Sequence, residues 1–260
     1  MTNTITYRSY LRLPELLDLQ TPLSDAHDEL LFISIHQASE IWLKLCLHEL
    51  RAAREQIVAD DLAPAFKMMS RVARVQSQLI QSWEVLATMT PADYTRMRGK
   101  LGTSSGFQSD QYRHVEFLLG NKKPEMVDVH EAEPAVAAAL RAELERPSLY
   151  DESIRLLARR GFDVPTQRDW TQPYVASEAV ERAWAAVYAD PDRHWDLYEL
   201  AEKLVDLEYH VQLWRFGHLK TVERVIGFKT GTGGTAGVAY LANVLKEGFF
   251  PELLSVRTRL

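Results

Sequence analysis

The chain has 260 residues, of which 46% are hydrophobic, and this is enough to bury a sizeable core. Its formal net charge is −6 with both signs spread along the chain, so we expect no nucleic-acid partner, which would need a basic stripe. With one cysteine, no signal-like N-terminus and no long uncharged apolar run, the sequence excludes an intrachain disulfide and predicts a cytoplasmic protein without a membrane span.

Apolar residues recur every three to four positions along most of the chain, which is the period of an α-helix. The pattern predicts a long helix over about 25–60 and a second over about 65–87. The sequence TPAD at 90–93 has the order of an N-cap, an N1 proline and an acidic N3 residue, so a short helix is expected there. Further helices are predicted over 107–119 and about 192–226.

Several prolines interrupt residues 124–177, and we interpret this segment as a peripheral insertion of shorter helices. The sequence contains no strand-like alternation, repeat or linker. We therefore predict an all-α fold in which residues 1–260 form a single domain, framed by the long helices at 25–60 and 192–226.

A glycine-rich segment, VIGFKTGTGGTAGVAYL, occupies residues 225–241. It follows a predicted helix rather than a strand, and no lysine follows its glycines, so it fits neither a dinucleotide fingerprint nor a Walker loop. Two interpretations remain, a plain surface loop and a hinged segment that closes over a ligand.

The eight histidines lack the spacings of zinc or di-iron sites. A lone histidine can still bind haem iron, because the porphyrin supplies four other ligands. His36 and His218 both lie on apolar helical faces and are the candidates, although a core histidine is the simpler interpretation of either one alone. Tyr94 and Arg98, one turn apart, could hold a carboxylate; the alternative is a surface arginine that lies across a tyrosine.

Six stretches follow one another along nearly the whole chain: TYRSYLRLPELL, HDELLFISIHQASEIWLKL, MTPADYTRMRGKLGTSSGFQSDQYR, EFLLGNK, LVDLEYHVQLWRFGHLKTVERVIGFKTGTGGTAG and FFPELLSVRT. Together they resemble the tryptophan 2,3-dioxygenase family of haem enzymes. The resemblance implies a largely helical homotetramer that contains haem b. It also implies an oxidoreductase that inserts O₂ across the indole C2–C3 bond of L-tryptophan and gives N-formyl-L-kynurenine, the first step of tryptophan catabolism.

The resemblance also implies roles for single residues. His218, in RFGHLKTV, matches the axial ligand of the haem iron, and His36, in FISIHQASE, matches a catalytic histidine that hydrogen-bonds the indole N–H. Whether His36 also takes the indole proton is open. The substrate-binding matches are Phe32 for the ring, Tyr94 and Arg98 for the carboxylate, and Thr232 for the amino-acid end.

On the haem side the matching residues are Trp83, Leu101, Ser105 and Gly106. An N-terminal arm, residues 1–23, is implied to reach into a neighbouring subunit's pocket through Tyr7, Tyr10 and Leu11. One departure lies beside the ligand, where Gly217 stands at a position at which bacterial relatives often carry arginine. Two rival functions are a helical scaffold without a cofactor and a haem protein with another activity, such as gas sensing.

Overall fold

The computed structural model describes residues 4–229 and 237–260, and within these ranges it contains helices and no strand, which confirms the all-α prediction. The elements are α1 Tyr7–Tyr10, α2 Leu13–Leu16, α3 Glu29–Val58, α4 Leu62–Leu86, α5 Pro91–Arg98, the 3₁₀ helix η1 Gly106–Gln108, α6 Asp110–Leu119, α7 Glu125–Asp128, α8 Pro134–Leu144, α9 Leu149–Arg159, α10 Glu178–Ala189, α11 Trp195–Val225, α12 Val238–Val244, α13 Pro251–Ser255 and the 3₁₀ helix η2 Val256–Arg259.

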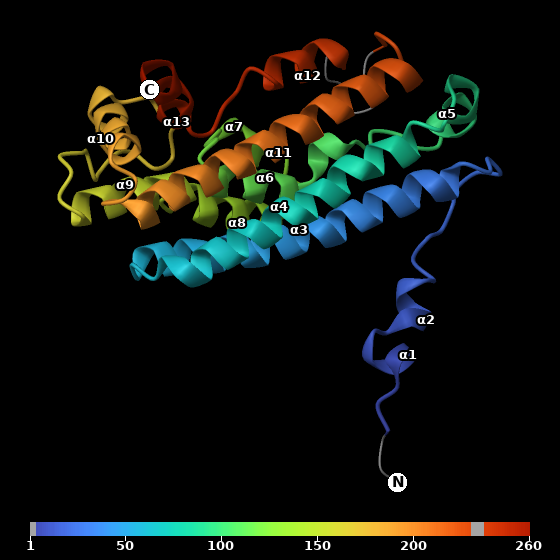
Figure 1. Cartoon of the computed structure of the whole chain (residues 1–260). Helices are drawn as coiled ribbons and strands as arrows, with labels where there is room; N and C mark the ends of the chain where they lie inside the picture. Colours follow the sequence, from blue (N-terminus) through green and yellow to red (C-terminus); the bar gives the residue numbers. More distant parts are fainter. Residues whose placement is uncertain (1–3, 230–236) are drawn as a thin grey trace.

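Three long helices, α3, α4 and α11, lie side by side and form the frame of the molecule (Figure 1). The helices predicted over 25–60 and 192–226 are α3 and α11. Helix α3 begins later than predicted because the Glu29 carboxylate accepts hydrogen bonds from the backbone N–H groups of Leu23 and Ser24, which keeps the chain before Glu29 in a turn.

The main core lies between α3, α4, α6, α9 and α11. On α3 it takes one face of the C-terminal half, with Leu43, Leu47, Leu50, Ala53 and Ile57 buried at helical spacing. Each of the leucine and isoleucine side chains stabilises the fold by about 1.5–3 kcal/mol relative to its exposed state.

Residues 124–177, predicted as a peripheral insertion, divide into two parts. Helices α7 and α8 cover Phe117 of α6 and form a separate small cluster with it. Helix α9 differs from the expectation, because Leu149, Tyr150 and Leu157 are fully part of the main core. Its amphipathic face contacts both α3 and α11, so this helix contributes to the frame itself.

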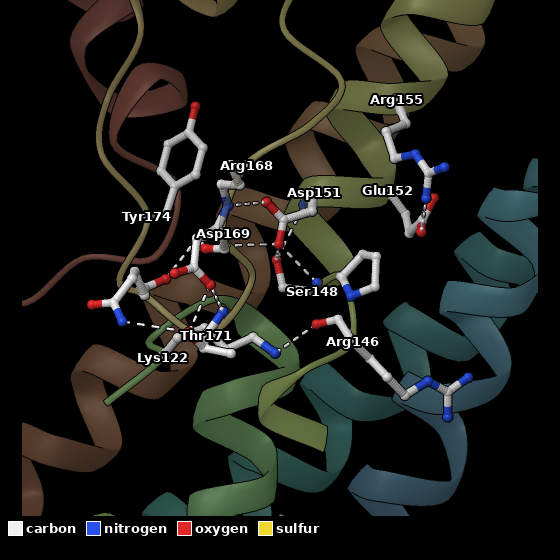
Figure 2. A network of polar contacts seen from close by, with 12 residues as sticks. Lys122, Arg146, Ser148, Asp151, Glu152, Arg155, Arg168, Asp169, Thr171 and Tyr174 are labelled. Atoms are coloured by element: carbon white, nitrogen blue, oxygen red, sulfur yellow. Dashed lines mark hydrogen bonds and ion pairs between the residues drawn. The ribbon is translucent and has the colours of Figure 1, made fainter. Parts of the chain in front are cut away.

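A polar network holds the segment after α9 against that helix (Figure 2). The Arg168 guanidinium donates two hydrogen bonds to the Asp151 carboxylate, at 2.7 and 3.0 Å. Nearby, the buried Lys122 ammonium donates to the carbonyl oxygens of Glu143, Leu144 and Arg146. Lys122 therefore donates to carbonyl groups at the C-terminal end of α8, and the Glu143 carbonyl also accepts from the Arg146 N–H.

Helix α3 is long and apolar enough to cross a membrane, judged by length and composition alone. A helix that packs inside a globular domain meets the same criteria, and α3 packs along α4, α6 and α9. The criteria therefore do not identify a membrane protein, and polar residues such as His36 and Glu40 interrupt the apolar sequence of the helix.

Helices α1 and α2 project away from the body of the chain (Figure 1). Tyr7 and Tyr10 are 75% and 76% exposed, and Leu11 is 41% exposed. The base of this arm is held to α3, since the Gln37 side chain donates to the carbonyl oxygen of Leu19 at 3.0 Å. In a single chain, the arm thus displays apolar side chains to solvent.

Candidate active site

A second hydrophobic cluster lies at the end of the frame where α5 is found (Figure 1), and we call it the α5-end cluster. It brings together side chains from α3, α4, α5 and α11. Its buried members are Leu86, Met89, Tyr94, Met97 and Val225, and the partly buried side chains around them are Ala26, Leu31, Phe32, Ile35, Trp83, Leu101 and Ile226. Four of the predicted site residues, Phe32, Trp83, Tyr94 and Leu101, are thus neighbours in space.

His36 joins this cluster from α3. Its imidazole lies against the Phe32 ring one turn earlier, with ring centroids 4.1 Å apart. Its Nδ1 atom is 2.7 Å from the Phe32 carbonyl oxygen. Because a carbonyl oxygen only accepts hydrogen bonds, Nδ1 carries the hydrogen, and in the neutral ring Nε2 is then an acceptor.

Burial disfavours the charged imidazole and lowers the pKa of His36 below its ordinary value, although the Phe32 carbonyl and Glu40 oppose the shift. At neutral pH the ring is therefore uncharged. A neutral ring with a fixed tautomer can accept a hydrogen bond from an N–H group of a ligand.

His218 faces the cluster from α11. Its imidazole is stacked on the Trp83 indole, with centroids 4.7 Å apart and 5° between the ring planes, and Trp214 packs beside it at 5.7 Å. Burial, together with the nearby His36, lowers the pKa of His218 to about 4. The two imidazoles are thus close enough to interact electrostatically, and His218 is neutral, as a metal-binding histidine must be.

Trp83 carries a buried donor with no acceptor. Its indole Nε1 has no hydrogen-bond partner among the residues that the structure describes. Buried polar groups without partners are rare in folded proteins, so such a donor indicates a missing acceptor. Trp83 therefore fits the predicted haem-side position, because haem carries two propionate groups that accept hydrogen bonds.

Tyr94 and Arg98 occupy α5, which begins with a reciprocal cap. The Thr90 hydroxyl accepts from the Asp93 N–H, and the Asp93 carboxylate accepts from the Thr90 N–H, as the TPAD pattern predicts. The Arg98 guanidinium carbon lies 5.9 Å from the centroid of the Tyr94 ring, so the two side chains lie together. Tyr94 is buried, which raises its pKa and keeps its hydroxyl protonated as a donor.

The remaining predicted residues belong to the segment after α5, the arm and the glycine-rich segment. Ser105 caps η1 by accepting from the Phe107 N–H, and Gly106 is the first residue of η1, an exposed turn after α5. The arm residues Tyr7, Tyr10 and Leu11 are exposed and distant from the cluster in a single chain. Thr232, with the glycines around it, lies outside the described residues.

Two features of the site were not assigned a role by the sequence. Trp214 joins Tyr112 of α6 to Trp83, with ring centroids 4.9 and 5.4 Å apart, and its place one turn before His218 on an apolar face was the available signal. Gly217 packs directly beneath Trp83; the sequence marked it only as a departure from the family beside His218 and as a glycine inside a long helix.

Comparison with known proteins places these observations in a family. A family model described as "Tryptophan 2,3-dioxygenase" matches residues 1–260. A protein of that name from Erythrobacter litoralis is 67% identical over 99% of both chains. Proteins of the same name from a Polaromonas species and from Paraburkholderia phytofirmans are 57% and 56% identical, over 98% and 100% of this chain and 88% and 86% of theirs. The chain belongs to the tryptophan 2,3-dioxygenase family.

Proposed function

We propose that the α5-end cluster and its two histidines form the site at which this chain oxidises L-tryptophan with O₂ to N-formyl-L-kynurenine, with haem b as the cofactor. Family membership over the full length supports the reaction. The site assignment rests on one observation. His36 from α3 and His218 from α11 lie at the same group of aromatic side chains.

The residues fit haem on the His218 side. In the described ranges no group of three His, Cys, Asp or Glu side chains could hold a metal ion, so a metal at His218 would need its other ligands from a bound group such as a porphyrin. His218 is neutral and half-buried, and Trp83 Nε1 lacks an acceptor. Bound haem would supply the ferrous iron that binds O₂.

The residues opposite His218 suit the substrate. L-Tryptophan is a zwitterion with a large apolar ring and one indole donor. Phe32 would pack on the ring, and His36 Nε2 would accept the indole N–H. Arg98 would pair with the carboxylate, with Tyr94 and, as the family resemblance implies, Thr232 beside it. Contacts at three separate points fix the ring relative to the iron, so the site would act largely by orientation.

His36 could also act as a general base. Because its Nε2 is the acceptor, the same atom that binds the indole N–H could take the proton as the ring is attacked. The apolar side chains of Leu86, Met97 and Leu101 would help to exclude water from the reacting atoms.

Assembly and location follow the family resemblance. We propose a homotetramer in the cytoplasm, in which each arm enters a neighbouring pocket. The exposure of Tyr7, Tyr10 and Leu11 supports this arrangement, since an arm that docks on a second chain would bury them.

One assay tests the proposal against its rivals. The full-length protein is loaded with haem, its Soret absorption is recorded, and N-formylkynurenine is measured after addition of L-tryptophan under air. We expect a Soret band and product formation. A colourless protein would favour the scaffold function, and a Soret band without turnover would favour another haem function.

A further inference from the structure

Gly217 lies in the interior of α11, directly before His218. Apart from proline, glycine is the residue least favourable to a helix interior, because it loses the most backbone freedom on folding. In this chain its presence inside α11 costs helix stability, and the packing around it offers a local reason.

That reason is the close approach of Trp83. A Cβ atom added at Gly217 would lie 2.7 Å from Trp83 Cδ1, 3.3 Å from Cγ and 3.5 Å from Nε1. These atoms belong to the five-membered ring of the indole, and Cγ is the atom through which the ring is bonded to the Trp83 Cβ. The ring could not move away from a Cβ without leaving its position on His218.

Within the part of the chain that the structure describes, the His218 imidazole is held by a ring stack on Trp83 and not by a hydrogen bond. A metal-binding histidine usually donates its second N–H to a carboxylate or carbonyl, and this contact fixes the rotation of the ring. Among the described residues, no hydrogen bond to the His218 imidazole is found; instead the ring lies parallel to Trp83 at 4.7 Å. Trp214 packs against both rings, with its centroid 5.4 Å from that of Trp83 and 5.7 Å from that of His218.

We propose that Gly217 is a positioning residue: its missing side chain lets the Trp83 indole lie flat on the His218 imidazole, and this stack sets the rotation of the ring that faces the iron. The inference rests on the proposed function, in which His218 is the axial ligand. It assigns to Gly217 and Trp83 together the orienting task that a hydrogen-bond acceptor performs in other haem and metal sites.

A thermodynamic cycle tests the contact without reference to haem. The full-length chain, without added haem, is melted as wild type, Gly217→Ala, Trp83→Ala and the double variant. We expect Gly217→Ala to lower the melting temperature in the wild type, because of the clash, and to raise it in the Trp83→Ala background, because alanine then only favours the helix. A change of the same sign in both backgrounds would overturn the inference. Gly99→Ala, at the C-cap of α5, is the control, since apart from its chain neighbours no described atom lies within 4 Å of its added Cβ.

The haem-loaded protein tests the consequence for the ligand. In Gly217→Ala the iron–histidine stretching band of the ferrous protein should shift in resonance Raman spectra, and haem affinity should fall by roughly tenfold to hundredfold, the range for overpacking a close contact. Gly99→Ala should leave both readouts unchanged. An unshifted band with wild-type haem affinity in Gly217→Ala would refute the positioning role.

The two proposals can fail separately. If His218→Ala keeps haem and an unaltered Soret band, the ligand assignment is wrong, and with it the orienting role of Gly217. If His218→Ala loses haem while the melting cycle shows no reversal of sign, the proposed function stands and the role of Gly217 alone is overturned.

Discussion

The Nδ1 atom of His36 lies 2.7 Å from the carbonyl oxygen of Phe32, one turn earlier in α3. This contact links two functions within one helical turn. In the proposed site the Phe32 ring would provide an apolar surface for the substrate ring, while the Phe32 carbonyl holds the hydrogen on Nδ1 and so leaves Nε2 as the acceptor. The chemistry of His36 is therefore set by backbone geometry and not by another side chain.

His36→Ala should lower kcat/KM for L-tryptophan. If His36 only accepts the indole N–H, the loss should be about 2- to 12-fold, as for one hydrogen bond of 0.5–1.5 kcal/mol. If it also takes the proton, the loss should reach roughly 10²- to 10⁴-fold. Steady-state kinetics with L-tryptophan distinguish these ranges.

The matched substrate for this experiment is 1-methyl-L-tryptophan, which has no indole N–H. With this substrate the wild type and His36→Ala should have similar kcat/KM values, because the contact is missing in both. An equal penalty for both substrates would mean that His36 acts through packing and not through the indole N–H.

The pH dependence of turnover should also reflect His36. Burial lowers its pKa below the ordinary 6.5, so the ring stays neutral as pH falls through that value. We expect kcat/KM to be constant from about pH 8 to 6.5 and to decline only at lower pH, when Nε2 becomes protonated and no longer accepts. His36→Gln, whose amide does not titrate, should lack the decline. A decline centred above pH 6.5 in the wild type alone would contradict this assignment.

Arg98→Ala should reduce kcat/KM for L-tryptophan by roughly 10- to 150-fold, mainly through KM, because a charge-assisted contact of about 1.5–3 kcal/mol is lost. Arg98→Lys should recover part of the loss, since it restores the charge without the two-pronged geometry. The exposed Arg96 of the same helix provides the control, and Arg96→Ala should have little effect. Tryptamine, which has no carboxylate, should show no penalty in Arg98→Ala; a similar loss with both substrates would argue against carboxylate binding.

Sequence patterns predicted the structural features that depend only on residues close together in the chain. The cap at Thr90 and Asp93 needs only atoms three residues apart, and Gly120 ends α6 because its φ of 117° is accessible to glycine. The meeting of His36 and His218 depends instead on how α3, α4 and α11 pack, which helical periodicity does not specify. Only the family resemblance paired these residues, and neither it nor periodicity predicted that α9 enters the core or that Gly217 lies beneath Trp83.

Mixed assemblies can test whether the arm acts in a neighbouring pocket. Tyr10→Ala should weaken an arm while its own pocket stays intact, and His218→Ala should inactivate a pocket while its arm stays intact. Each variant alone should show low activity, whereas assemblies that contain both should regain part of it, since intact arms then meet intact pockets. Activity no higher than the sum of the two separate variants would indicate that each arm serves its own chain or none.

A buried ion pair away from the site should govern acid stability. Glu143 of α8 accepts from the Arg54 and Arg51 guanidinium groups of α3, at 2.6 and 3.2 Å, and both Glu143 and Arg54 are buried. Burial disfavours the Glu143 carboxylate, but the charges and hydrogen bonds of Arg54 and Arg51 outweigh it and lower the pKa of this group below 4.5. The ionised pair thus ties α8 to the frame.

Glu143→Gln should cost about 3–5 kcal/mol of unfolding free energy at pH 7, because it leaves the buried Arg54 without its counter-charge. A carboxyl whose pKa is lower in the folded than in the unfolded state stabilises the fold above the unfolded pKa, near 4.5, and loses this effect as pH falls through the folded pKa. The wild type should therefore lose its advantage over Glu143→Gln in that acid range. Urea unfolding of both proteins between pH 7 and 3 measures the difference in their unfolding free energies. The control is Glu145→Gln, because Glu145 is exposed. A difference that persists unchanged to pH 3 would show that the glutamine disrupts packing and not the charge pair.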